Sequence, residues 1–224
     1  MPPDRGRRGA VGEPGDGAAP RSRYPDYDVL DRWDGPDWDG PTRAVVRRRL
    51  AEVPPIRFLT PDEARLLQAV ADRIVPQLER PPGARVPIVP WIDEKLWHDW
   101  RDGYRYADLP PQRDAWRAGL AALAETARLL HALDFAALDE AAQDDLLARV
   151  QRGDVPGAAW SHIPARRFFR DVLCITVVKT YFAHPAAWSE IGYGGPSSPR
   201  GHVRNWMGGV DPWEPAEQTG EGSS

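Results

Sequence analysis

The sequence predicts an all-α protein: a single helical-bundle domain of about five main helices, with an irregular N-terminal arm and a Gly/aromatic-rich C-terminal extension. Two observations support this fold class. Apolar residues recur at helical spacing in segments that begin and end at residues typical of helix starts and stops. No alternating apolar and polar run of strand length occurs in the sequence. Such helices must bury their apolar stripes against one another, which a bundle achieves.

The first main helix is expected to begin at Thr60-Pro61-Asp62-Glu63 and to end at Pro76. The threonine hydroxyl can cap the helix, proline is favoured at the first helical position, and Glu63 completes a capping box. Apolar residues then follow at helical spacing: Leu67, Val70, Ala71 and Ile74.

Prolines also mark the starts of the second and third helices. Pro90 can open the second helix, in which Ile92, Leu96 and Trp100 recur every four residues, and Gly103 is expected to close it. The third helix follows Pro110-Pro111 and is rich in alanine. Its apolar face is expected to comprise Trp116, Leu120, Leu123, Ala127 and Leu130.

Two further helices complete the predicted bundle. Asp134 or Asp139 can cap a fourth helix, and Gly153 is suited to the left-handed residue that ends it. A fifth is expected from near Pro164 to about Ala183, where His184-Pro185 stops it. Its apolar residues form a broad stripe: Phe168, Val172, Ile175 and Phe182, widened by Phe169, Leu173, Thr176 and Val177. A stripe of that width belongs at the centre of a bundle.

The composition divides the chain into five parts. Residues 1–22 are predicted to be a disordered leader, and residues 23–55 an ordered arm with a short helix from Thr42. The helical domain is predicted over residues 56–185. Residues 186–213 form the Gly/aromatic-rich extension, which is expected to pack on the domain or on a partner, and residues 214–224 a disordered tail.

The charge pattern and the single cysteine exclude several classes of function. The net charge is −4 with basic and acidic residues interspersed, so the sequence shows no basic face for nucleic acid. Cys174 is the only cysteine, which excludes an intrachain disulfide, and its apolar neighbours indicate a core position. No segment approaches the ~20 apolar residues that a membrane-spanning helix needs.

Residues with catalytic or metal-binding potential are scattered. Glu94 and His98 lie one helical turn apart and could share a metal, but we interpret them as a solvated helix contact. The nearest approaches to paired carboxylates are Asp134 with Asp139 and Asp144 with Asp145. These lie in polar helical segments with no accompanying base or oxyanion group. We therefore predict no catalytic, cofactor-binding or metal-binding residue in this chain.

The extension is the strongest candidate for a functional surface. Residues 188–213 contain six glycines and four aromatic residues, a composition that suits neither a helix nor a solvated tail. Aromatic and arginine side chains dominate many interfaces, and glycine lets backbone approach a partner closely. The candidate partner-binding residues are Trp188, Tyr193, Gly194, Gly195, Arg200, Arg204 and Trp206. The alternative is that the extension folds back over its own helices as a lid.

Three segments carry a resemblance to a known family. These are FLTPDEARLLQAVADRIVP at Phe58–Pro76, the helix containing Phe168-Phe169, and WSEIGYGGPSSPRG from Trp188. The chain resembles the gluconate 2-dehydrogenase subunit 3 family over roughly residues 56–213. Members are small, gamma-type subunits of flavin-dependent sugar and polyol dehydrogenases. They accompany a large flavoprotein subunit of the glucose-methanol-choline type and often a cytochrome c subunit.

The resemblance implies a non-catalytic subunit, or a maturation and stability partner, with no cofactor of its own and FAD in the partner. Many members also carry a twin-arginine signal. Here Arg7-Arg8 is followed by no apolar region, so a cytoplasmic location is expected, and the N-terminus does not support export together with a partner.

Two other functions stay open at this point. One is a stand-alone enzyme acting on a small carbohydrate or polyol, with His98, Glu94 or the Asp134 region as acid and base. The other is a helical adaptor for an unrelated protein.

Overall fold

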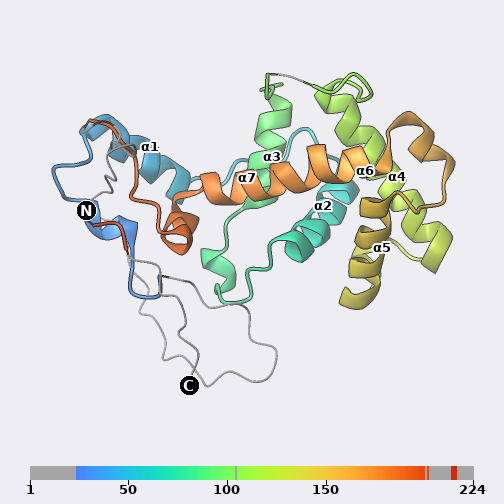
Figure 1. The fold of residues 1–224 in the computed structure, drawn as a ribbon, viewed down its shortest axis with the longest axis horizontal. Coiled ribbons are helices and arrows are strands. Elements are labelled where there is room, and N and C mark those ends of the chain that lie inside the picture. The colour runs from blue at the N-terminus through green and yellow to red at the C-terminus, as the bar shows by residue number, and fades with distance from the viewer. Residues whose placement is uncertain (1–23, 104, 200, 202–212, 216–224) are drawn as a thin grey trace, which may run out of the picture. The chain divides into compact units, whose positions relative to one another are not determined.

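The fold is described from a computed structural model, for residues 24–103, 105–199, 201 and 213–215 (Figure 1). The chain divides into two compact units. Unit 1 combines Met1–Glu52 with Phe182–Ser224, and unit 2 is Val53–Tyr181. Throughout the described residues the regular elements are helices and no strand forms, which confirms the all-α prediction. The predicted leader, residues 1–22, lies outside the described residues, as does most of the predicted tail.

Unit 2 begins with α2 (Pro61–Ile74), and the predicted capping box at its start is confirmed. The Glu63 N–H donates to Thr60 Oγ1 at 3.2 Å, and the Thr60 N–H donates to the Glu63 carboxylate at 2.8 Å. The helix ends just before Pro76, as predicted. Its buried face comprises Leu66, Leu67, Val70 and Ala71.

The helix α3 (Ile88–Trp97) differs from the prediction at both ends. It starts at Ile88, before Pro90. Proline is tolerated there because backbone N–H groups in the first helical turn have no partner within the helix. The helix ends at Trp97 rather than near Gly103, because Asp99 adopts the left-handed conformation with φ 52°. Aspartate is one of the few side chains that tolerate this conformation. Trp100 therefore lies outside the helix.

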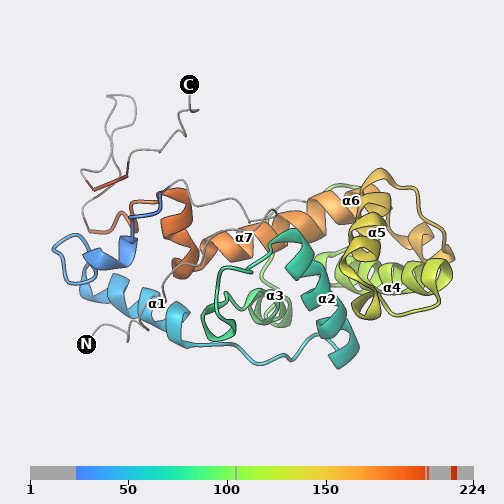
Figure 2. The same cartoon turned by 90° about the horizontal axis from the view of Figure 1, so that it is seen from below.

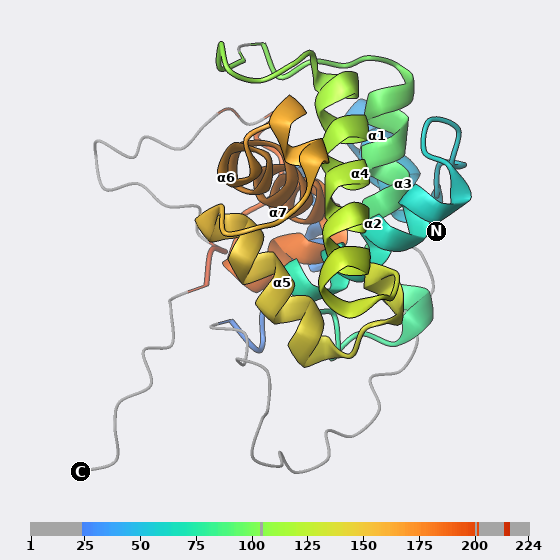
Figure 3. The same cartoon turned by 90° about the vertical axis from the view of Figure 1, so that its right-hand side faces the viewer.

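The helix α4 (Gln112–His131) packs against α2 on one side and, on the other, against the helical run from α6 (Ala165–Arg167) to α7 (Ile175–Ala183) (Figure 3). Most of its predicted apolar face is buried: Trp116, Leu120, Leu123 and Ala127, whereas Leu130 is 38% exposed. Gly119 lets the ring of Phe168 approach the α4 backbone. A Cβ atom at Gly119 would lie 2.1 Å from that ring.

The fourth predicted helix is α5 (Glu140–Arg152), and both of its predicted signals are present. The Asp139 carboxylate caps it by accepting from the Ala142 N–H at 2.8 Å. Gly153 ends it with φ +76°. The other candidate cap, Asp134, instead precedes the 3-10 helix η3 (Phe135–Ala137).

The fifth predicted helix is a continuous helical run with a π-helical segment in its middle. It consists of α6 (Ala165–Arg167), the π-helical η5 (Phe168–Cys174) and α7 (Ile175–Ala183). The wider π turn places one extra residue in the run and rotates the following residues around the axis. Ile175 is consequently 43% exposed, which corrects its predicted place in the apolar stripe. The buried stripe is Phe168, Val172, Leu173, Thr176, Val177 and Tyr181.

Unit 1 is built from the arm and the extension. The arm contains the 3-10 helix η1 (Val29–Arg32) and α1 (Gly40–Ala51), which starts slightly before the predicted Thr42 because Asp39 caps it. The extension begins with the 3-10 helix η6 (Pro185–Ile191), so residues 188–191 are helical, contrary to the prediction that the stretch from Trp188 is irregular throughout. Figures 1 and 2 show η6 lying beside α1.

We predict that Gly119→Ala destabilises unit 2. Alanine gains about 1 kcal/mol of helix propensity over glycine. The fully buried Phe168 ring would have to move, however, and overpacking of this kind costs about 1–3 kcal/mol, here at the upper end. The urea midpoint of unfolding should therefore fall. Gly83→Ala is the control, because nothing lies within 4 Å of a Cβ atom there. Equal midpoints for the two variants would contradict the packing argument.

Candidate functional site

The arm and the extension share one hydrophobic cluster within unit 1. It consists of Val29, Trp33, Trp38, Val46 and Trp188. Trp33 and Trp38 meet edge to face, with ring centroids 5.9 Å apart and an interplanar angle of 72°. Trp188 from the extension is only 7% exposed. Four of the five side chains belong to the arm, and Trp188 of the extension joins them, so the extension is held by burying a large aromatic side chain against the arm.

Hydrogen bonds fix the backbone of the extension on the arm. The Tyr27 hydroxyl donates to the Tyr193 carbonyl at 2.9 Å. The Val29 N–H donates to Ser189 Oγ at 3.1 Å, and that hydroxyl donates to the Asp28 carboxylate at 3.2 Å. Ser189 is therefore both acceptor and donor, and it ties η6 to the start of η1.

Two glycines allow the extension to approach the aromatic rings of the arm. Gly192 and Gly195 have φ of +64° and +89°, in the region that favours glycine. A Cβ atom would lie 2.8 Å from the Tyr24 ring at Gly192 and 2.9 Å from the Trp38 ring at Gly195. Gly194 is also buried, but its φ is not positive, and its carbonyl accepts from Trp213 Nε1 at 2.9 Å.

The outward side of this turn exposes two apolar side chains. Ile191 is 48% exposed and Tyr193 is 42% exposed. The Tyr193 ring packs edge-on against Trp188, with centroids 5.3 Å apart and an interplanar angle of 81°. Trp188 thus packs against one side of the Tyr193 ring, and the other side faces solvent. We call Ile191 and Tyr193 the extension surface.

The predicted partner-binding residues therefore separate into groups. Trp188, Gly194 and Gly195 pack inward within unit 1, whereas Tyr193 faces outward. Arg200, Arg204 and Trp206 lie outside the described residues, so the roles predicted for them stay predictions.

Sequence reasoning missed the side chains of the arm that receive the extension, and it missed Ile191. A signal was present. The arm carries four aromatic residues among Asp, Gly and Pro, namely Tyr24, Tyr27, Trp33 and Trp38, and this composition resembles that of the extension.

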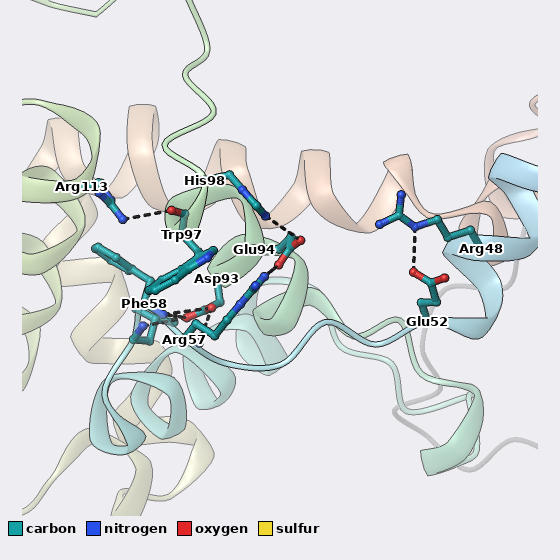
Figure 4. A network of polar contacts seen from close by, with 10 residues as sticks. Arg48, Glu52, Arg57, Phe58, Asp93, Glu94, Trp97, His98 and Arg113 are labelled. Carbon is teal, nitrogen blue, oxygen red and sulfur yellow. Dashed lines mark hydrogen bonds and ion pairs between the residues drawn. The ribbon is translucent and has the colours of Figure 1, made fainter.

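The carboxylate of Asp93, on α3, is buried and binds the backbone of the segment at the start of unit 2 (Figure 4). Its side chain is fully buried and accepts the backbone N–H groups of Arg57, Phe58 and Leu59 at 2.7, 3.0 and 2.7 Å. These three bonds supply the hydrogen-bond donors that a buried carboxylate needs. Asp93 thereby fixes the segment that leads into α2 on α3.

Glu94 and His98 form the helix contact that their spacing indicates. His98 Nε2 lies 3.2 Å from Glu94 Oε1, and the Arg57 guanidinium binds the same carboxylate (Figure 4). Over the described residues no group of three or more His, Cys, Asp or Glu side chains could hold a metal ion. The Glu94 carboxylate is thus already shared by His98 and Arg57.

The predicted carboxylate pairs are engaged in structural contacts. Asp134 accepts from Arg128 at 2.9 Å beside a pocket of about 180 Å³, and Asp139 caps α5. Arg73 binds Asp144 through both carboxylate oxygens and holds the pKa of that carboxyl below its usual value. Asp145 has a lowered pKa for the same reason, a hydrogen bond from Arg149. A general acid at neutral pH needs the opposite shift.

Cys174 ends the π-helical segment η5. Its side chain is partly buried, and burial raises the pKa of the thiol. A thiol with a raised pKa is a poor nucleophile at neutral pH, which fits the packing role predicted from its neighbours.

The comparison with family models identifies one family. A model described as gluconate 2-dehydrogenase subunit 3 matches residues 61–195, more than half of the 224-residue chain. The match begins at the first residue of α2 and ends at Gly195, so it includes the extension surface. No curated protein and no solved structure matches the chain. No helix among the described residues is long and apolar enough to cross a membrane.

We predict that Gly195→Ala loosens unit 1 while unit 2 stays folded. The substitution adds left-handed backbone strain and a clash with Trp38, together about 2–5 kcal/mol. Gly201→Ala is the matched control, because Gly201 has φ +87° but nothing within 4 Å of its Cβ position. Indole N–H exchange at Trp33 and Trp38, followed by NMR, should accelerate much more in the first variant. Equal acceleration in both would show that the Trp38 contact is unimportant.

Proposed function

The chain belongs to the gluconate 2-dehydrogenase subunit 3 family, and from this premise we propose that it is a non-catalytic small subunit or maturation partner of a flavin-dependent dehydrogenase. The family is named for a subunit of a dehydrogenase complex. The proposed partner is a large flavoprotein subunit of the glucose-methanol-choline type, which would bind FAD and oxidise a sugar or polyol. A cytochrome c subunit is a further proposed member of the complex.

The observation that carries this proposal is the family match over residues 61–195. The contacts of the polar side chains agree with a role that needs no chemistry from this chain. Arg73, Arg128 and Arg149 bind the carboxylates of Asp144, Asp134 and Asp145. In each of these ion pairs the carboxylate is bound by an arginine, which favours its charged form and disfavours a role as a general acid.

The extension surface supports docking on physical grounds. Tyr193 offers a large aromatic area on a turn that Gly192, Gly195 and the bond from Tyr27 hold in one conformation. A side chain that is already ordered loses little entropy when it binds. Tyrosine is also among the residues that contribute most to interface energies.

We predict that the double variant Ile191→Ser, Tyr193→Ala weakens binding to the proposed flavoprotein subunit. Loss of the exposed apolar area should raise the Kd by about 10–100-fold. Purified full chain can be titrated into the flavoprotein and followed by calorimetry. The control is Val45→Ser on α1, which removes a similarly exposed side chain, 53% exposed, from the same unit.

Two outcomes would contradict the proposed function. Recovery of the wild-type chain as a lone monomer after co-expression with the flavoprotein would exclude a stable complex. Flavin absorbance and sugar-dependent dye reduction by the isolated chain would favour the stand-alone enzyme.

A further inference from the structure

The turn after α3 exposes two tryptophans on the surface of unit 2. Trp97, the last residue of the helix, is 45% exposed, and Trp100 is 56% exposed. Of the other tryptophans that the structure describes in unit 2, Trp116 is buried, and Trp91 and Trp160 are partly buried. Exposed tryptophan is uncommon on a protein surface that has no partner, because it leaves a large apolar area in water.

The backbone of this turn is tightly defined. The Asp99 N–H donates to the Leu96 carbonyl at 3.2 Å, and the Trp100 N–H donates to the Lys95 carbonyl at 3.0 Å. This is the Schellman pattern of helix termination, in which the residue in Trp100's position usually packs back on the helix. Here that residue points substantially into solvent instead. Asp99 adopts the required left-handed conformation, although glycine is the usual residue there.

Neighbouring side chains hold both rings. His98 stacks on Trp100, with centroids 4.7 Å apart and an interplanar angle of 13°. The Arg57 guanidinium lies 5.3 Å from the centre of the Trp97 ring, and Arg113 donates to the Trp97 carbonyl at 3.2 Å (Figure 4). The two tryptophans are therefore ordered before any partner binds, which reduces the entropic cost of binding.

The charges around the tryptophans compensate one another within the chain. Three ion pairs surround the turn: Arg57 with Glu94, Arg101 with Asp99, and Lys95 with Asp102. Three cations thus face three carboxylates, and Arg113 at the Trp97 carbonyl adds one further positive charge. A strongly charged partner would gain little from such a surface, and an anionic membrane would require an excess of basic residues. The electrostatics therefore fit an apolar, weakly charged patch on a folded protein.

We propose that Trp97 and Trp100 form a second docking surface, the α3 surface, which receives an apolar and weakly charged patch of the flavoprotein subunit. This inference rests on the proposed function. It adds a contact on unit 2 to the extension surface, which belongs to unit 1. The two tryptophans supply the contact area, and the ion pairs that fix the turn keep the surface nearly neutral.

The test compares full-length variants in binding to the proposed flavoprotein subunit. The single variant Trp100→Ala should raise the Kd by about 10-fold. The double variant Trp97→Ala, Trp100→Ala should raise it by about 100-fold or more. Raising NaCl from about 0.05 to 0.5 M should change the wild-type Kd by less than about threefold, because few unpaired charges take part. Leu129→Ala is the matched control, since Leu129 is 58% exposed on α4.

Circular dichroism melting accompanies each variant. Trp100 lies outside the helix and is more than half exposed, so Trp100→Ala keeps the test valid if the double variant unfolds. Wild-type affinity in a folded Trp100→Ala variant would overturn the α3 surface and leave the proposed function standing. Failure of the wild-type chain to bind the flavoprotein would overturn both. Tryptophan-dependent binding to phosphatidylcholine–phosphatidylglycerol vesicles would replace the protein partner with a membrane.

Discussion

The contact between the Gly195 backbone and the Trp38 ring is the constraint on which unit 1 depends. It joins a segment near the start of the chain to one near the end, beside a cluster in which Trp188 of the extension joins four side chains of the arm. The ring of Tyr193 packs against Trp188 on its inner side, which leaves its other face toward solvent. Self-packing is therefore compatible with the proposed docking: the inward residues fix the turn, and the exposed parts of Ile191 and Tyr193 form the surface proposed to meet a partner.

Unit 2 also depends on a close approach between a glycine and an aromatic ring, here Gly119 and Phe168. The Phe168 ring occupies the space left by Gly119 and meets Trp116 edge to face, with centroids 6.2 Å apart. The π-helical segment that begins at Phe168 then sets which residues of α7 are buried. The helix α3 packs on α2, and backbone hydrogen bonds from Asp99 and Trp100 define its C-terminal turn.

Local signals in the sequence predicted most helix boundaries, whereas a π turn and the pairing of distant segments could not be predicted from them. The capping box at Thr60 and the glycine cap at Gly153 act within a few residues, so a linear reading finds them. The exposure of Ile175 depends on a π turn that no local pattern in the sequence indicates. The pairing of the arm with the extension joins residues far apart in sequence, and only their similar composition hinted at it.

The central claim is that this chain docks on a flavoprotein through surfaces fixed by its own packing. Hydrogen–deuterium exchange of the full chain, free and bound to the flavoprotein, tests it most directly. The account predicts slower exchange on binding in residues 188–195, around the extension surface, and in residues 97–100, around the α3 surface. A stable complex in which both segments exchange as fast as in the free chain would contradict it.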